Sequence, residues 1–200
     1  MAPWTHTYLS PQSERRLCCA SREQHSFIHQ YIDQPGESGG SYRPVTLAEH
    51  WNGDLLRSVR RRMMAGERLP ECEVCQDQVL NLHTYRQYFT ETLFKDYVQR
   101  AFDTTDDDGR TTMEPISFDY RLTNRCNYKC RMCGEQLSSA WENEKRENGE
   151  WSPERDPWMV PQQRAIIESF QKSITKTEFA RTISAEMMEE LYWVDGEPLV

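Results

Sequence analysis

The sequence has no apolar run of the roughly 20 residues that a membrane-spanning helix requires. The first residues lack the basic start and apolar stretch of a secretory signal, because Pro3, His6 and Pro11 stand there instead. Basic residues are the minority, since 24 Lys and Arg against 32 Asp and Glu give a net charge of −8. This balance argues against a general nucleic-acid or acidic-membrane surface.

Hydrophobic residues make up only 37% of the 200 residues, which suffices for the core of one or two domains. Cysteine is well represented, with seven in the chain. An odd number of cysteines without an export signal indicates metal ligation more than disulfide bonds. We therefore expect the protein in the reducing cytoplasm.

Three of the cysteines, Cys126, Cys130 and Cys133, lie within eight residues. In the segment 115–122, just before them, apolar residues fill every second position, which predicts a β-strand. The cysteines are thus expected on a loop that leaves the C-terminal end of a strand. A structural zinc or iron–sulfur site normally has four protein ligands. Three thiolates leave one coordination position open, which predicts a site where chemistry takes place.

The segment 122–133, LTNRCNYKCRMC, resembles the C-x3-C-x2-C signature of radical S-adenosylmethionine enzymes. By this resemblance, Cys126, Cys130 and Cys133 each bind one iron of a 4Fe–4S cluster, and S-adenosylmethionine chelates the fourth iron. Met132 takes the apolar position that packs near the adenine. The implied reaction is electron transfer from the reduced cluster to the sulfonium, which breaks a carbon–sulfur bond. The resulting 5′-deoxyadenosyl radical takes a hydrogen atom from the substrate.

A second segment, 191–198 or LYWVDGEP, resembles the second strand of that family and its Gly-Gly-Glu-Pro turn. The resemblance implies that Asp195, Gly196, Glu197 and Pro198 hold the methionine end of the cofactor, although Asp195 stands where the family has a glycine. Both motifs follow predicted strands. Parallel strands joined by a crossover end at the same edge of a sheet, so we expect both motifs on one face.

The other four cysteines are Cys18, Cys19, Cys72 and Cys75. With Pro3-Trp4 before them and an Arg-rich helix between them, they resemble the twitch or SPASM-type auxiliary-cluster module, which implies a second iron–sulfur cluster. Adjacent thiols rarely bind one ion together, so one member of the Cys18-Cys19 pair is expected to dominate. Two alternatives remain open, namely a zinc site that recruits His25 or His29 and ordinary buried thiols.

The expected fold is α/β, namely the beginning of a partial (β/α) TIM-type barrel preceded by a small cysteine-containing α+β module. Residues 1–86 would form the twitch/SPASM-like module, 87–114 a helical linker, and 115–200 the first two strands of the radical S-adenosylmethionine core. A barrel needs further strands. We therefore expect a fragment truncated after the second strand, or one part of a split protein, that is inactive alone.

Local patterns predict the smaller elements. Thr46 and Glu49 have capping-box spacing, and the helix that they begin is expected to break at Asn52-Gly53 and to end near Gly66. The arginines of this helix are expected on a solvated face. A hairpin is predicted from 5–10 with 16–20, one long helix or two helices over 76–102, and helices over 135–148, 162–170 and 177–189.

The expected function is that of a radical S-adenosylmethionine oxidoreductase or transferase acting on an unidentified peptide or small molecule. Its electron donor would be a reductase or a flavodoxin- or ferredoxin-type protein. The alternative is a non-enzymatic iron–sulfur or zinc module with a structural or electron-transfer role.

Overall fold

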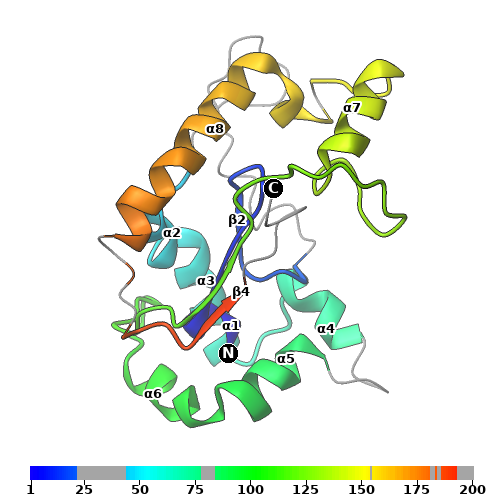
Figure 1. Cartoon of the computed structure of the whole chain (residues 1–200). Helices are drawn as coiled ribbons and strands as arrows, with labels where there is room; N and C mark the ends of the chain where they lie inside the picture. Colours follow the sequence, from blue (N-terminus) through cyan, green and yellow to red (C-terminus); the bar gives the residue numbers. More distant parts are fainter. Residues whose placement is uncertain (22–43, 78–83, 154, 181–182, 184–185, 193–200) are drawn as a thin grey trace.

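The computed structural model describes residues 1–21, 44–77, 84–153, 155–180, 183 and 186–192. In this part of the chain, a four-stranded open sheet lies at the centre of the molecule, with the strand order β2-β1-β3-β4 (Figure 1). The strands are β1 (His6–Leu9), β2 (Arg15–Arg16), β3 (Ser117–Tyr120) and β4 (Glu190–Tyr192). The protein is therefore a mixed α/β protein built on an open sheet.

Two of the three strand pairings agree with the sequence predictions, and the pairing of β1 with β3 was not predicted. β1 and β2 form an antiparallel hairpin, in which Tyr8 lies opposite Arg16. β3 runs parallel to β1, and β4 runs parallel to β3, with Ser117 opposite both His6 and Glu190. The prediction that the strands before the two motifs are parallel is confirmed, and both strands end at the same edge of the sheet.

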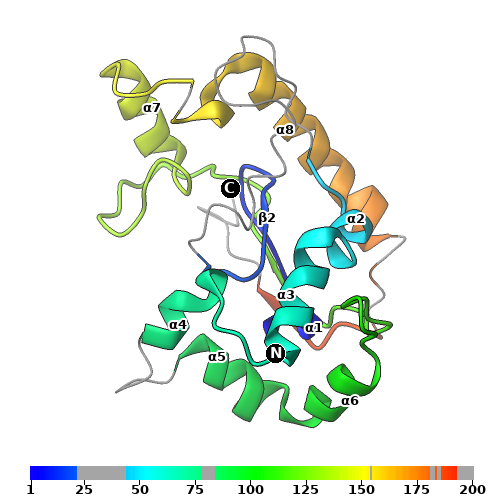
Figure 2. The same cartoon turned by 180° about the vertical axis from the view of Figure 1, so that it is seen from behind.

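Helices lie on both faces of the sheet (Figures 1 and 2). One face packs against α2 (Leu47–Trp51), α3 (Asp54–Met64) and α8 (Pro161–Ile174), which η7 (Thr175–Phe179) continues. The other face is met by α4 (Glu73–Asp77), α5 (Tyr85–Gln87) and η4 (Tyr88–Leu93). The remaining elements are α1 (Ala2–Thr5), η3 (Pro70–Cys72), η5 (Lys95–Tyr97), α6 (Val98–Asp103), α7 (Ser139–Glu147) and η6 (Pro157–Met159).

The two faces of the sheet differ in character. Phe118 and Tyr120 of β3 belong to the main hydrophobic core with side chains of α2, α3 and α8. Since side chains alternate along a strand, Ser117 and Asp119 point to the opposite face. That second face is polar yet buried, because Ser117 is 0% and Asp119 5% exposed.

The expected helix breaks are confirmed around α2 and α3. Thr46 and Glu49 form the capping box, α2 ends at Trp51, and α3 begins after Gly53. Gly66 follows the end of α3 with a φ of +76°, a left-handed conformation that glycine adopts without strain.

The prediction of a solvated arginine face on α3 is wrong for Arg60, whose exposed fraction is 0%. Its guanidinium lies 4.8 Å from the ring centroid of Trp51 and donates to the carbonyl oxygen of Pro3 at 2.8 Å and to Asn52 Oδ1 at 3.0 Å. A long side chain with a planar cation can satisfy buried carbonyls and stack on an aromatic ring at once. Charge patterning along one helix does not show such distant partners.

The helix predicted over 177–189 is also wrong for every described residue after Phe179. The helical stretch ends at Phe179, and residues 183 and 186–189 are not helical. The backbone N–H of Glu189 already donates to the carbonyl of Ile116 at 2.9 Å, which extends the pairing that β4 makes beside β3. Tertiary pairing with the sheet therefore overrides the local helical pattern. The helix predicted over 135–148 begins later, at Ser139.

Among the described residues, no helix combines the length and the apolar character needed to cross a bilayer.

His6 of β1 is a buried histidine in a hydrogen-bonded row across three strands. Its Nδ1 lies 2.8 Å from Ser117 Oγ, and this hydroxyl donates to Glu190 Oε2 at 2.7 Å. Because the hydroxyl proton is used on Glu190, Nδ1 carries the proton of the neutral imidazole. Nε2 has no hydrogen-bond partner within the described part of the chain. Burial lowers the pKa of His6 from 6.5 to about 3.

We expect the protein to lose stability on acidification because of His6. The folded-state pKa lies below the unfolded value, so the unfolded chain binds more protons between pH 6.5 and about 3. The free energy of unfolding should fall by about 2 kcal/mol between pH 7 and pH 5 from this residue alone. Denaturant unfolding at both pH values measures the loss. His6→Asn, which keeps a donor toward Ser117, should flatten it; an unchanged slope in this variant would contradict the assignment.

Candidate functional site

The three clustered cysteines lie on a loop that leaves the C-terminal end of β3 and leads to α7, as the sequence predicts. In Figure 1 this loop runs from the end of the sheet toward α7, away from the main body of helices. Cys126 and Cys133 are half-buried, Cys130 is exposed, and all three are free thiols. Cysteine sulfur is the donor type that iron–sulfur clusters use, so the chemistry of the three residues suits such a group. The described residues do not, however, bring these three sulfurs close enough together to hold one metal ion.

The first turn of α7 holds the backbone of this loop. Ser139 Oγ accepts from the backbone N–H of Cys126 and donates to its carbonyl, both at 3.0 Å. Ser138, the N-cap of α7, donates to the carbonyl of Tyr128 at 2.7 Å. The indole of Trp141 donates to the carbonyl of Cys130 at 3.1 Å. Three side chains from one helix end therefore fix the loop while its sulfurs stay unconstrained by disulfides.

The side chains of the loop itself are largely solvent-exposed. Met132 is 91% and Tyr128 59% exposed, which is unusual for large apolar groups. The second motif of the sequence, Asp195 to Pro198, lies outside the described residues. β4, which precedes that motif, ends at Tyr192 opposite Asp119 and so stops beside the end of β3.

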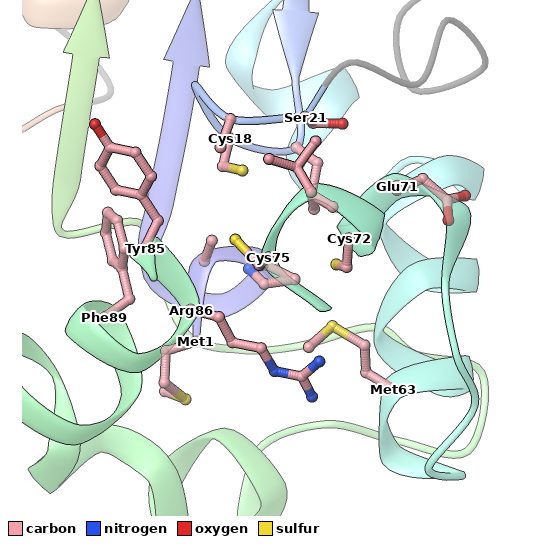
Figure 3. Close-up of a pocket in the computed structure, with 15 residues that line it drawn as sticks. Met1, Cys18, Ser21, Met63, Glu71, Cys72, Cys75, Tyr85, Arg86 and Phe89 are labelled. Atoms are coloured by element: carbon pink, nitrogen blue, oxygen red, sulfur yellow. The ribbon is translucent and has the colours of Figure 1, made fainter. Parts of the chain in front are cut away.

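A second cysteine group lines a pocket between the β1–β2 hairpin and α4 (Figure 3). Cys18 comes from the turn after β2, Cys72 from the end of η3, and Cys75 from α4. Their sulfurs face the pocket together with the guanidinium of Arg86. The pocket contains about 510 Å³ of empty space, its open side included. Residues more than 50 positions apart in the sequence thus meet at one cavity.

The adjacent cysteines Cys18 and Cys19 have different surroundings. Cys18 lines the pocket, whereas Cys19 is not among the described residues that line it. The charges that act on Cys19 are those of Asp119 and Arg121, which lie on β3 and just after it. The structure therefore places Cys18, and not Cys19, with Cys72 and Cys75.

Burial governs the acidity of these thiols. It raises the pKa of Cys18 to about 12, and the neighbouring Cys19 adds to this effect. Burial also raises the pKa of Cys72, which the positive charge of Arg86 opposes. At neutral pH both thiols hold their protons, so a metal that binds here must displace them. In the described part of the chain, no three His, Cys, Asp or Glu side chains are gathered closely enough to hold one metal ion.

Comparison of the chain with known protein families, with curated proteins and with solved structures finds no match. The assignment of a function therefore depends on the residues and their arrangement.

Sequence patterns did not identify two groups of residues at these sites. Arg86 lines the cysteine pocket from α5, although nothing in its local sequence marks it. The buried residues Asn124 and Glu142 form a polar cluster with the half-buried Arg164 at the base of the cysteine loop. Ser138 and Ser139, which precede Trp141, could have signalled the N-terminus of α7. No local signal points to the partners of Asn124, because they come from two separate helices.

Proposed function

We propose that this chain is a radical S-adenosylmethionine protein, in which Cys126, Cys130 and Cys133 hold a 4Fe–4S cluster. One observation carries the proposal: the three free thiols occupy a loop at the C-terminal end of β3, and the parallel neighbour β4 ends at the same edge. Functional residues of α/β proteins collect at the carboxyl ends of parallel strands. When bound, the cluster supplies one electron to the sulfonium of S-adenosylmethionine, which starts radical chemistry on a substrate.

The chain's own residues have distinct roles in this proposal. Ser138, Ser139 and Trp141 hold the loop backbone, so that the three thiolates can meet one cluster. The exposed side chain of Met132 offers an apolar surface for the adenine. The residues assigned to the methionine end are Asp195, Gly196, Glu197 and Pro198, which follow β4. A reductase or a flavodoxin- or ferredoxin-type protein would deliver the electron, and the substrate is an unidentified peptide or small molecule.

Anaerobic reconstitution with iron and sulfide tests the proposal. We expect one cluster at the loop and a change in the electron paramagnetic resonance signal of the reduced protein when S-adenosylmethionine is added. Zinc at the loop with no such response would instead favour a structural or electron-transfer module.

We further propose that Cys18, Cys72 and Cys75 hold a second iron–sulfur cluster and that Cys19 takes no part. The support is the shared pocket, which three of these four thiols line. The predominantly apolar lining, with residues such as Leu17, Met63 and Phe89, would exclude water from a cluster, and Arg86 would balance its negative charge.

Separate alanine variants of the adjacent cysteines test this assignment. In a chain whose loop cysteines are all replaced, Cys18→Ala should lower the iron bound after reconstitution by about tenfold, because a ligand is lost. Cys19→Ala should bind as much iron as its parent. Iron and sulfide analysis gives both values. Equal loss in the two variants, or a loss confined to Cys19→Ala, would contradict the assignment.

A further inference from the structure

A buried polar cluster lies where the cysteine loop, α7 and α8 meet. Asn124 stands two residues before Cys126 and is 2% exposed. Its amide Nδ2 donates to Glu142 Oε2 at 2.6 Å, and its Oδ1 accepts from Arg164 Nη2 at 3.0 Å. Arg164 also lies 3.4 Å from Glu142 Oε2, and Arg146 lies 3.2 Å from Glu142 Oε1. Every polar atom of the Asn124 amide is therefore bound, and the carboxylate of Glu142 has two cations.

Asn124 also closes the base of the loop. Its Nδ2 donates to the carbonyl of Glu135 at 3.2 Å, so the second residue before the first cysteine is tied to the second residue after the last one. Its own carbonyl accepts from the backbone N–H of Ser139 at 2.7 Å. The hydroxyl of the same Ser139 accepts from the backbone N–H of Cys126 and donates to its carbonyl. One side chain thus connects both ends of the cysteine loop with the start of α7.

The loop is held by hydrogen bonds and not by apolar packing, with Ser138 and Trp141 of α7 binding its middle in addition to the bonds at its base. Residues 127–132 are all exposed, so the loop buries almost no apolar surface of its own. A segment of this kind keeps its shape through its hydrogen bonds, because few packing contacts oppose its movement. The spacing of the three sulfurs therefore depends on these bonds, and the cluster at the base anchors both ends of the loop.

We propose that Asn124 is a positioning residue that acts with Glu142 and Arg164. The three polar side chains fix the base of the loop. The sulfurs of Cys126, Cys130 and Cys133 can then hold the iron–sulfur cluster where S-adenosylmethionine reaches its open iron. This inference rests on the proposed function. Residues that orient metal ligands typically change affinity or activity by about 10- to 100-fold when replaced.

The test uses the full 200-residue chain, reconstituted anaerobically and titrated with S-adenosylmethionine while the electron paramagnetic resonance signal is followed. Asn124→Asp keeps the shape but turns a carboxylate oxygen toward the oxygens of Glu135 and Glu142. We expect the S-adenosylmethionine concentration for the half-maximal change to rise by about tenfold. Arg164→Met removes the cation that holds Oδ1 and should act in the same direction. Both substitutions act through the same polar side-chain cluster. The double variant should therefore raise the half-maximal S-adenosylmethionine concentration by less than the product of the two single effects.

Glu168→Ala is the matched control. This residue is the exposed partner of Arg164 on α8, at 3.3 Å, and its loss leaves the buried cluster intact. The control should titrate within twofold of the unchanged chain. If Asn124→Asp does not take up the iron–sulfur cluster, the iron bound per chain is measured instead. Less bound iron in Asn124→Asp and Arg164→Met, but not in Glu168→Ala, supports the inference.

Three results would overturn the positioning role: titrations of both variants that match the unchanged chain, effects that multiply fully in the double variant, or an equal loss in the control. The proposed function fails in a different way. In that case the unchanged chain itself carries a cluster at the loop and gives no response to S-adenosylmethionine.

Discussion

Replacing Cys126 with alanine is expected to abolish the change that S-adenosylmethionine causes in the signal of the reduced cluster. A cluster with one single open iron, as S-adenosylmethionine requires, needs a thiolate on each of the other three irons. With one thiolate missing, the cluster is lost or a second iron is left open. The same result is expected for Cys130→Ala and Cys133→Ala. Iron analysis of each variant should show the loss of the loop cluster, while the iron held at the Cys18 pocket remains.

Cys19→Ala is the matched control for these variants, because Cys19 belongs to neither proposed cluster. It should retain the full response to S-adenosylmethionine and its iron content. Each loop variant is compared with it in far-ultraviolet circular dichroism, so that loss of fold is separated from loss of cluster. A response that persists in any one of the three loop variants would show that the cluster is held by other residues.

Removal of the carboxylate of Glu178 is expected to lower the free energy of unfolding by about 3 to 5 kcal/mol. Glu178 lies in η7 and forms a buried ion pair with Arg15 of β2, whose side chain is 0% exposed. The same carboxylate accepts from the hydroxyl of Tyr120 at 2.8 Å and from the backbone N–H of Leu47 at 2.9 Å. The side chain of Glu178 therefore connects η7, which continues α8, with β2, with β3 and with the first residue of α2.

The size of this effect comes from the charge that is left behind. Glu178→Ala would remove the carboxylate that pairs with the buried guanidinium of Arg15, whose bonds to the hydroxyl of Tyr120 at 3.0 Å and to the carbonyl of Val45 at 2.7 Å involve neutral groups. Removing one partner of a buried ion pair destabilises a protein far more than losing a surface pair does. The variant Arg15→Met/Glu178→Leu removes both charges and is expected to be more stable than Glu178→Ala. Urea unfolding of the metal-free protein gives the free energy of unfolding of the unchanged chain and of both variants.

Glu168→Ala again provides the control, because Glu168 pairs with Arg164 on the exposed side of α8. Its loss should change the free energy of unfolding by less than about 0.5 kcal/mol. A similarly small effect for Glu178→Ala would mean that the ion pair contributes little to holding α8 on the sheet.

Several elements followed directly from local sequence. The alternation before Cys126 predicted β3, the capping-box spacing of Thr46 and Glu49 predicted the start of α2, and Gly66 marked the end of α3. These signals are short-range, since they depend on side-chain periodicity and on the first hydrogen bonds of a helix. The sequence also predicted that the strands at 117–120 and 190–192 run parallel, because a crossover connection joins them.

Other features depended on residues far apart in the chain. Arg60 was expected in solvent and is buried, because its partners Pro3 and Trp51 come from other elements. The helix predicted after Phe179 gave way to pairing with the start of β3. In both cases a long-range contact outweighed a local preference, which a single sequence does not display.

The sequence alone determined that three closely spaced cysteines follow a strand, since the spacing of Cys126, Cys130 and Cys133 and the alternation before them can be read from neighbouring residues. Only the tertiary structure decided which cysteine of the pair at 18 and 19 faces Cys72 and Cys75, and that Asn124, Glu142 and Arg164 meet beneath the loop. The physical reason is that burial and hydrogen bonding are properties of side chains brought together from distant elements. Local periodicity places a residue on a strand or helix, but packing determines what it contacts.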